Sequence, residues 1–233
     1  MEKQAVLNQI RHGLIVSCQA RQGWAMHGSD IMAAFAPAAR EGGAVGLRGN
    51  GVQDLLKMRE RVPDLPMIGI NKQWLQGYEV YITPTYESAR QIIETGVEVI
   101  ALDATPRTRP GGVTFAQLAE EIRRKHPQVL IMGEVSTARE AKALRDLDID
   151  LISTTLSGYT PDSEGIKTVN LPLIREIRES TPFPIIAEGQ IHTVEDAVAA
   201  YEAGAHSVVV GTSITRPEII TARFVQGIAS YFA

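Results

Sequence analysis

Eight short apolar runs, separated by longer amphipathic segments, constrain the fold of this 233-residue chain more than any other feature. They are nearly continuous in apolar character and rich in β-branched residues, as expected of parallel strands buried on both faces. Such strands alternating with helices predict a (β/α)8 barrel. The runs cover residues 14–18, 44–48, 67–71, 99–103, 130–134, 151–155, 184–188 and 207–211.

The segments between the runs carry helix signals. Thr137 followed by Glu140, and Thr193 followed by Asp196, have the spacing of a capping box. An additional extended segment, residues 80–85, follows the third run. The predicted helices cover residues 30–40, 85–95, 114–125, 137–147, 171–179, 193–203 and 216–231.

We therefore expect one domain, a TIM barrel of the phosphate-binding type that spans residues 1–233. The length lies within the roughly 200–250 residues that such a barrel needs, and no Pro/Gly/Ser-rich linker divides the chain. A doubly wound open sheet is the competing architecture. It is less favoured because eight strand–helix units fit this length without a second domain.

The bulk charge excludes some classes of partner. A net charge of −4 and a pI near 5.8 leave no general basic surface for nucleic acid or anionic membrane. No apolar run approaches the roughly 18 residues of a membrane span. The single cysteine, Cys18, and an N-terminal segment without the apolar region of a signal peptide indicate a cytoplasmic protein.

Ionisable side chains gather at the predicted C-terminal strand ends, where barrels of this class carry their active sites. Lys72 shares the face of Ile68 and Ile70, because alternate strand residues point the same way, and should therefore enter the barrel mouth. A partly desolvated amine has a lowered pKa and can act as a base or a Schiff-base nucleophile. The alternative is a solvated lysine at a strand end. The other polar strand-end residues are Gln19, Arg48, Asp103, Glu134, Thr154, Thr155 and Glu188.

The same alternation directs Arg48, Asp103 and Glu188 into the barrel. Asp103 and Glu134 could hold a hard cation between neighbouring strands, but no His/Cys ligand motif is present and we expect no metal. No dinucleotide-binding glycine pattern follows the first run, so we expect no nicotinamide cofactor.

Glycines follow the seventh and eighth runs, in IIAEGQIHT and VVVGTSITRP. Barrels of this class bind phosphate at these two places, because glycine lets backbone N–H groups approach an anion and short helices begin there. The alternative is that both are only turn glycines. The predicted phosphate cradle contains Gly189, Gln190, Gly211, Thr212 and Ser213, with Arg216 as a counter-charge.

The sequence resembles the N-acetylmannosamine-6-phosphate 2-epimerases over almost its whole length. The resemblance implies epimerisation at carbon 2, without metal or cofactor, between N-acetylmannosamine 6-phosphate and N-acetylglucosamine 6-phosphate in sialic acid catabolism. The matching segments are GLIVSCQ (13–19), EGGAVGLR (41–48), IGINK (68–72), VIALDAT (99–105), STTLSGYT (153–160), IIAEGQIHT (185–193) and VVVGTSITRP (208–217).

The resemblance also implies residue roles. Lys72 corresponds to the catalytic lysine and Glu188 to its partnering carboxylate. The implied substrate contacts are Gln19, Arg48, Asp103, Glu134 and Tyr159. IGINKQW replaces the usual IGIVKRD around the lysine, and Glu134 stands where an aspartate is common.

Three questions stay open at this level. A Schiff-base aldolase acting on a sugar phosphate, or a barrel that only binds a sugar phosphate, would place a lysine and a phosphate cradle similarly. Trp24, Trp74 and Tyr159 could cover a sugar face or only pack loops. A homodimer is possible, with Ala33–Ala39 at the interface.

Overall fold

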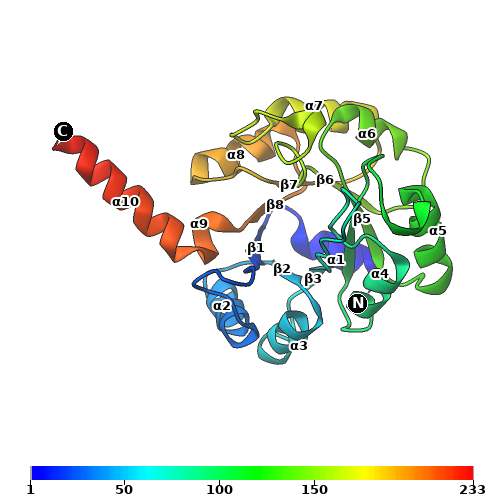
Figure 1. Cartoon of the computed structure of the whole chain (residues 1–233), viewed down its shortest axis with the longest axis horizontal. Helices are drawn as coiled ribbons and strands as arrows, with labels where there is room; N and C mark the ends of the chain where they lie inside the picture. Colours follow the sequence, from blue (N-terminus) through cyan, green and yellow to red (C-terminus); the bar gives the residue numbers. More distant parts are fainter. Residues whose placement is uncertain (1, 233) are drawn as a thin grey trace.

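The computed structural model describes residues 2–232, in which eight parallel strands close into one barrel (Figure 1). Each strand pairs with the next along the chain, and β1 pairs with β8. The predicted TIM barrel is therefore confirmed, and no open sheet forms. The strands are β1 (Leu14–Cys18), β2 (Gly46–Asn50), β3 (Met67–Ile70), β4 (Val99–Asp103), β5 (Leu130–Glu134), β6 (Leu151–Ser153), β7 (Ile185–Glu188) and β8 (Ser207–Val210).

Helices surround the barrel, and the capping boxes predicted at Thr137 and Thr193 are both present. Helices α1 and α3 fall outside the predicted ranges, and each buries two residues. The helices are α1 (Lys3–Ile10), α2 (Ser29–Glu41), α3 (Val52–Arg61), α4 (Tyr86–Ile93), α5 (Phe115–Lys125), α6 (Ala138–Ala143), α7 (Leu171–Ser180), α8 (Val194–Ala203), α9 (Thr212–Thr215) and α10 (Pro217–Tyr231), with 3-10 turns η1 (Pro110–Gly112) and η2 (Pro161–Ser163).

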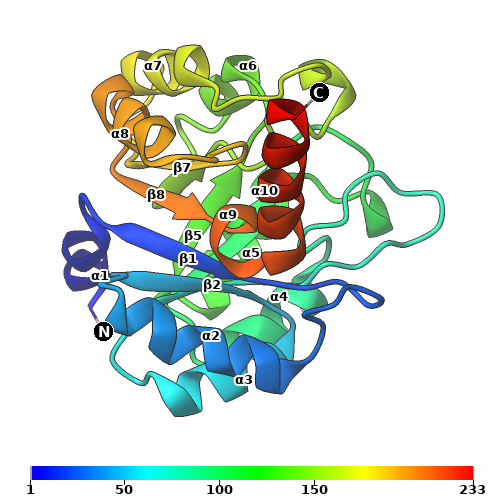
Figure 2. The same cartoon turned by 90° about the vertical axis from the view of Figure 1, so that its left-hand side faces the viewer.

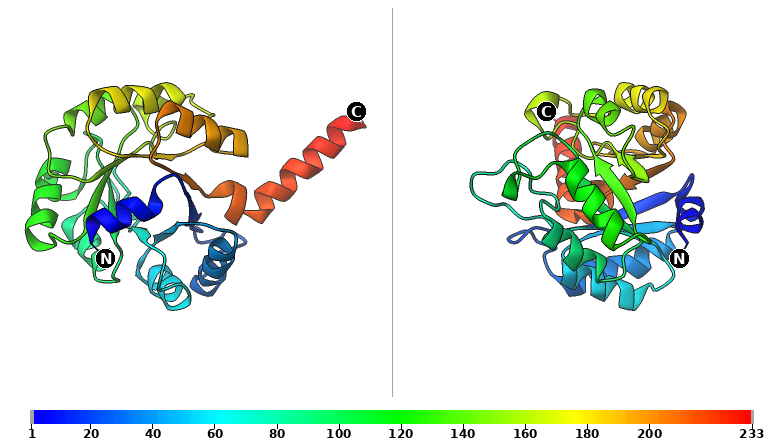
Figure 3. Two further views of the ribbon diagram at one scale, coloured as in Figure 1. Left: turned by 180° about the vertical axis from the view of Figure 1, so that it is seen from behind. Right: turned by 90° about the vertical axis from the view of Figure 1, so that its right-hand side faces the viewer.

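Two apolar layers form the core. Inward-facing strand residues fill the barrel, whereas Ile100, Leu102 and other outward-facing residues pack against the helices. Val6 and Ile10 of α1 join the inner layer, so this helix closes one end of the barrel (Figure 3). The opposite end, where the strands finish, is left for polar side chains.

Five strand boundaries differ from the prediction, since β6, β7 and β8 are shorter by one or two residues and the changes at β2 and β3 affect site residues. β2 covers Gly46–Asn50 rather than residues 44–48, so Arg48 lies in mid-strand and Asn50 at its end. β3 ends at Ile70, and Lys72 instead forms an isolated antiparallel bridge with Ile82. Ile82 belongs to the extended segment predicted at residues 80–85. This bridge continues the alternation of β3 by two residues, so that Lys72 is on the same side as Ile68 and Ile70.

Helix α10 departs from the ring. It projects away from the barrel in Figure 1 and therefore lies in front of the barrel in Figure 2, and none of its residues is buried. Phe224, Val225 and Ile228 leave 59–70% of their surface exposed. Each helix from α2 to α8, by contrast, buries at least two residues. No helix within residues 2–232 combines the length and apolar character that crossing a membrane requires.

Candidate active site

A cavity of about 500 Å³, here called the central pocket, opens at the mouth of the barrel. It brings together residues from β1, β2, β7 and β8 and from the loops that follow the strands. Asp103, Glu134 and Ser213 are outside its lining. The predicted site residues that line it are Gln19, Arg48, Lys72, Tyr159, Glu188, Gly189, Gln190, Gly211, Thr212 and Arg216.

A buried ion-pair cluster forms the floor of the pocket. Arg48 of β2, only 1% exposed, donates from Nη2 to Glu134 Oε1 at 2.5 Å and from Nη1 to Glu188 Oε1. Glu134 is completely buried, and burial raises its pKa, while the charges of Arg48 and Lys72 oppose that shift. Three strands therefore fix one guanidinium between two carboxyl groups, because an unpaired charge there would be costly.

Lys72 stands beside this cluster as a separate, partly buried amine. Its backbone N–H donates to Asn50 Oδ1 at 2.8 Å, and the bridge to Ile82 fixes it from the other side. Burial, together with the positive charge of Arg48, lowers the pKa of Lys72 to about 7. Within residues 2–232, no carboxylate lies within 4 Å of the amine to restore its charge. A substantial neutral fraction therefore exists near neutral pH, as a general base requires.

Several polar atoms in the pocket wall have no protein partner. Across residues 2–232, Gln19 Oε1, Arg48 Nε and Glu134 Oε2 are buried without a hydrogen bond. Glu188 is better satisfied, since its Oε2 accepts from the Thr155 hydroxyl at 3.1 Å. Buried polar groups are normally paired, so the unpaired atoms of Gln19 and Arg48, which line the pocket, are available to a bound polar molecule.

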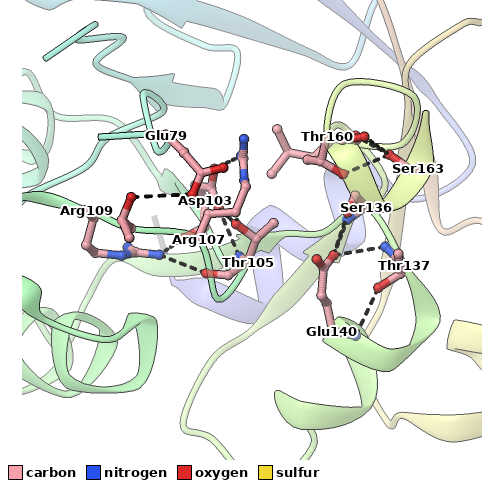
Figure 4. A network of polar contacts seen from close by, with 12 residues as sticks. Glu79, Asp103, Thr105, Arg107, Arg109, Ser136, Thr137, Glu140, Thr160 and Ser163 are labelled. Atoms are coloured by element: carbon pink, nitrogen blue, oxygen red, sulfur yellow. Dashed lines mark hydrogen bonds and ion pairs between the residues drawn. The ribbon is translucent and has the colours of Figure 1, made fainter. Parts of the chain in front are cut away.

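Asp103 is engaged within its own loop. Its Oδ2 accepts from Arg107 at 2.5 Å, and its Oδ1 accepts from the backbone N–H and hydroxyl of Thr105 (Figure 4). Arg109 also donates to the Asp103 carbonyl at 2.8 Å.

Asp103 pairs in register with Glu134, but an arginine binds each of the two carboxyl groups. Residues 2–232 contain no group of three or more His, Cys, Asp or Glu side chains positioned for a metal.

The opposite side of the pocket is built from loops after β7 and β8. Gly189 has a backbone φ of +101°, a conformation that residues with a side chain rarely adopt. At Gly211 the reason for glycine is space, because a Cβ there would lie only 3.2 Å from Ser17 Cβ. Helix α9 begins at Thr212, and the first N–H groups of a helix have no intrahelical partner. Arg216 follows, paired with Glu218 at 2.7 Å. The predicted cradle residues therefore lie around one opening, although Ser213 lies behind it.

Several pocket residues were not predicted, among them three polar side chains that could meet a ligand. Arg21 and His27 come from the loop after β1, and Asn50 from the end of β2. The alternation that includes Arg48 would have revealed Asn50 if the strand had been extended by two residues. Nothing in the local pattern around Arg21 marks it. At the outer rim, Gln190 Nε2 donates to the half-exposed Tyr159 hydroxyl at 3.1 Å.

Comparison with known proteins identifies the family. A family model described as "Putative N-acetylmannosamine-6-phosphate epimerase" (NanE) matches residues 32–230. The chain belongs to this family. Two relatives named "Putative N-acetylmannosamine-6-phosphate 2-epimerase" agree with it. The protein from Caldanaerobacter subterraneus subsp. tengcongensis is 46% identical over 220 residues, covering 94% of this chain and 92% of the relative. The protein from Clostridioides difficile is 41% identical over 223 residues, covering 96% and 99%.

Solved structures agree. The N-acetylmannosamine-6-phosphate 2-epimerase from Clostridium perfringens superposes with a TM-score of 0.90 at 41% identity, covering 94% of this NanE-family chain and 95% of that one. A thiamine phosphate pyrophosphorylase from Pyrococcus furiosus, at 15% identity and a TM-score of 0.60, shares the fold alone. The epimerase family expected from the sequence is thus confirmed.

Proposed function

We propose that this protein interconverts N-acetylmannosamine 6-phosphate and N-acetylglucosamine 6-phosphate, with Lys72 as the base at carbon 2. One observation carries the proposal: Lys72, fixed by Asn50 and by its bridge to Ile82, lines the pocket of a NanE-family barrel together with Arg48 and Glu188. The family resemblance further suggests that the reaction belongs to sialic acid catabolism.

The proton transfer follows from the chemistry of the sugar. The hydrogen on carbon 2 is acidic only beside the carbonyl of the open-chain aldose. Neutral Lys72 removes it, and the electron pair moves to the carbonyl oxygen to give an enolate. The Lys72 ammonium exchanges its protons with solvent, and a proton is then added to carbon 2 on the opposite face, which gives the other epimer and leaves the amine neutral again. General-base catalysis of this kind contributes about 10²–10⁴ in rate.

The ion-pair cluster supplies the electrostatics. Arg48 is held rigidly by Glu134 and Glu188, so its charge is oriented before substrate binds. Burial and the charge of Arg48 together lower the pKa of the neighbouring Lys72. We assign Arg48 to stabilising the developing oxyanion and Glu188 to orienting the carbonyl end. Asp103 and Glu134 lie outside the pocket lining. We assign Asp103 to fixing the loop after β4 and Glu134 to fixing Arg48.

The phosphate end provides orientation. We assign it to the backbone N–H groups after Gly189 and Gly211, with Thr212, Gln190 and Arg216 around them. Binding energy at this remote group fixes the reacting carbon near Lys72.

Proton NMR in D2O tests the reaction. N-acetylmannosamine 6-phosphate should become the gluco epimer and acquire deuterium at carbon 2. Retention of the carbon 2 hydrogen and of the starting sugar would contradict the proposal. Borohydride added with substrate should trap no adduct on Lys72, whereas a Schiff-base aldolase would be trapped.

We also infer that the protein forms a homodimer through α10. The 15 residues of α10 lie outside the ring of helices, and none of them is buried. On α8, Val194 and Val198 are also exposed, with 74% and 50% of their surface accessible. If two copies of the chain exchange this helix, the exposed apolar side chains of each copy become buried against the other copy. Light scattering should give twice the 25.4 kDa mass of one chain. Phe224→Asp with Ile228→Asp should give a monomer, and an unchanged mass would contradict α10 as the contact.

A further inference from the structure

The guanidinium of Arg21 can add a second positive charge, besides that of Arg216, to the side of the central pocket formed by the loops after β7 and β8. It belongs to the loop after β1 and lines the pocket together with Arg216. Since β1 pairs with β8, this loop lies beside the loop that carries Gly211. Direct contact between the loops follows from Trp24, whose ring centroid is 3.7 Å from the Arg216 guanidinium carbon.

Arg21 is held by aromatic faces. Its guanidinium carbon lies 5.5 Å from the ring centroid of Trp24 and 5.0 Å from that of Trp74. Trp74 in turn stacks on Tyr81 at 5.5 Å, with an angle of 11° between the rings. A cation over an aromatic face is attracted without being neutralised. These contacts therefore position the charge at the rim and leave it available.

The other arginines of the pocket are already paired. Arg48 is bound by two carboxylates, and Arg216 by Glu218. Arg21 has no acidic partner within 4 Å among residues 2–232. Its charge also reaches the reaction end of the pocket, where it contributes to lowering the pKa of Lys72. A phosphate dianion is the kind of ligand that would satisfy this free guanidinium.

We propose that Arg21 is a substrate-binding residue that pairs with the phosphate group, complementing Arg216. The identity of the phosphate as part of an amino sugar rests on the proposed function. The aromatic contacts hold the guanidinium at the rim before substrate arrives, which lowers the cost of ordering it. Trp24 and Trp74 are therefore positioning residues for Arg21, and they are also the two tryptophans of the chain.

Calorimetry with inorganic phosphate tests Arg21 independently of any epimerase activity. Arg21→Ala should weaken phosphate binding about tenfold, and Arg21→Lys should recover part of the loss. The matched control is Arg40→Ala, an exposed arginine paired with Asp64 far from the pocket, which should bind like wild type. Equal phosphate affinity in Arg21→Ala and wild type would overturn the proposal.

Two further measurements separate this proposal from the proposed function. Tryptophan fluorescence should change when phosphate binds to wild type and not when it binds to Arg21→Ala; equal changes would oppose the assignment. With N-acetylmannosamine 6-phosphate, Arg21→Ala should raise KM about tenfold and change kcat much less. If wild type binds phosphate through Arg21 but does not epimerise this sugar, the proposed function fails and the assignment of Arg21 stands.

Discussion

The two sides of the central pocket hold their polar groups in different ways. The floor, formed by Arg48, Glu134 and Glu188, is largely buried and joined by ion pairs. The rim, formed by the loops after β1, β7 and β8, is open and leaves backbone N–H groups and Arg21 available. Charges that must act on a reacting carbon benefit from preorganisation in a low dielectric. Charges that capture a phosphate must stay accessible to it. We therefore expect the chemistry at the floor and the binding at the rim.

The largest expected effect is on turnover when the amine at the floor is removed. Lys72→Ala should lower kcat about 10³-fold, because it deletes the base, and should leave the Kd for sugar phosphate within a few-fold. Steady-state kinetics and calorimetry measure the two quantities. Lys57→Ala, which removes an exposed lysine paired with Asp30, is the control. A variant that kept its turnover would contradict Lys72 as the base, and a wild type that bound the sugar phosphate without converting it would favour a pocket that only binds.

The second prediction concerns the ion-pair cluster. Arg48→Ala should lower the free energy of unfolding by about 3 kcal/mol, because it leaves two carboxyl groups at the floor without their partner. Urea denaturation measures the change. Arg90→Ala removes a solvent-exposed arginine paired with Glu87 and Glu94, and should barely alter stability. Equal losses in the two variants would mean that the floor is not the preorganised region described above.

The third prediction is the pH dependence of kcat/KM. Lys72 must be neutral to accept a proton, and its pKa is lowered to about 7. The rate constant should therefore fall roughly tenfold per pH unit below pH 7 and level off above it. A phosphate ester also titrates near pH 6, so substrate affinity should be measured over the same range. A profile that keeps rising to pH 10 would show a lysine with an ordinary pKa.

The smallest effect is expected at the rim. Arg216→Ala should raise KM about tenfold and leave kcat within about twofold, since it removes one charge-assisted contact to the phosphate. The unphosphorylated sugar offers the matched comparison, because its affinity should not respond to Arg216. A kcat loss as large as that of Lys72→Ala would erase the distinction between floor and rim.

The sequence predicted the floor better than the rim. Period-two alternation is a property of the strand itself, so Arg48, Lys72 and Glu188 could be directed inward before the fold was known. The glycines after β7 and β8 were placed at the pocket for a similar reason, since their position in a barrel is fixed, and both line it. Strand ends were less certain: β2 is offset by two residues, which hid Asn50.

Contacts between loops could not be predicted in this way. Asp103 alternates inward, but Arg107 and Thr105 in the following loop engage it, and no periodicity encodes that turn. The stacking of Arg21 between Trp24 and Trp74 joins loops that are about fifty residues apart in the chain. The helical pattern of α10 likewise predicts a helix, but not whether its apolar face packs on its own barrel.

Chemical rescue gives the most direct test of Lys72 as the proton carrier. Exchange of the carbon 2 hydrogen in D2O can be followed by NMR for Lys72→Ala, with and without added ethylamine. The variant should show no exchange alone and should recover part of it as the concentration of free amine rises. Exchange at the wild-type rate without any amine would contradict the account.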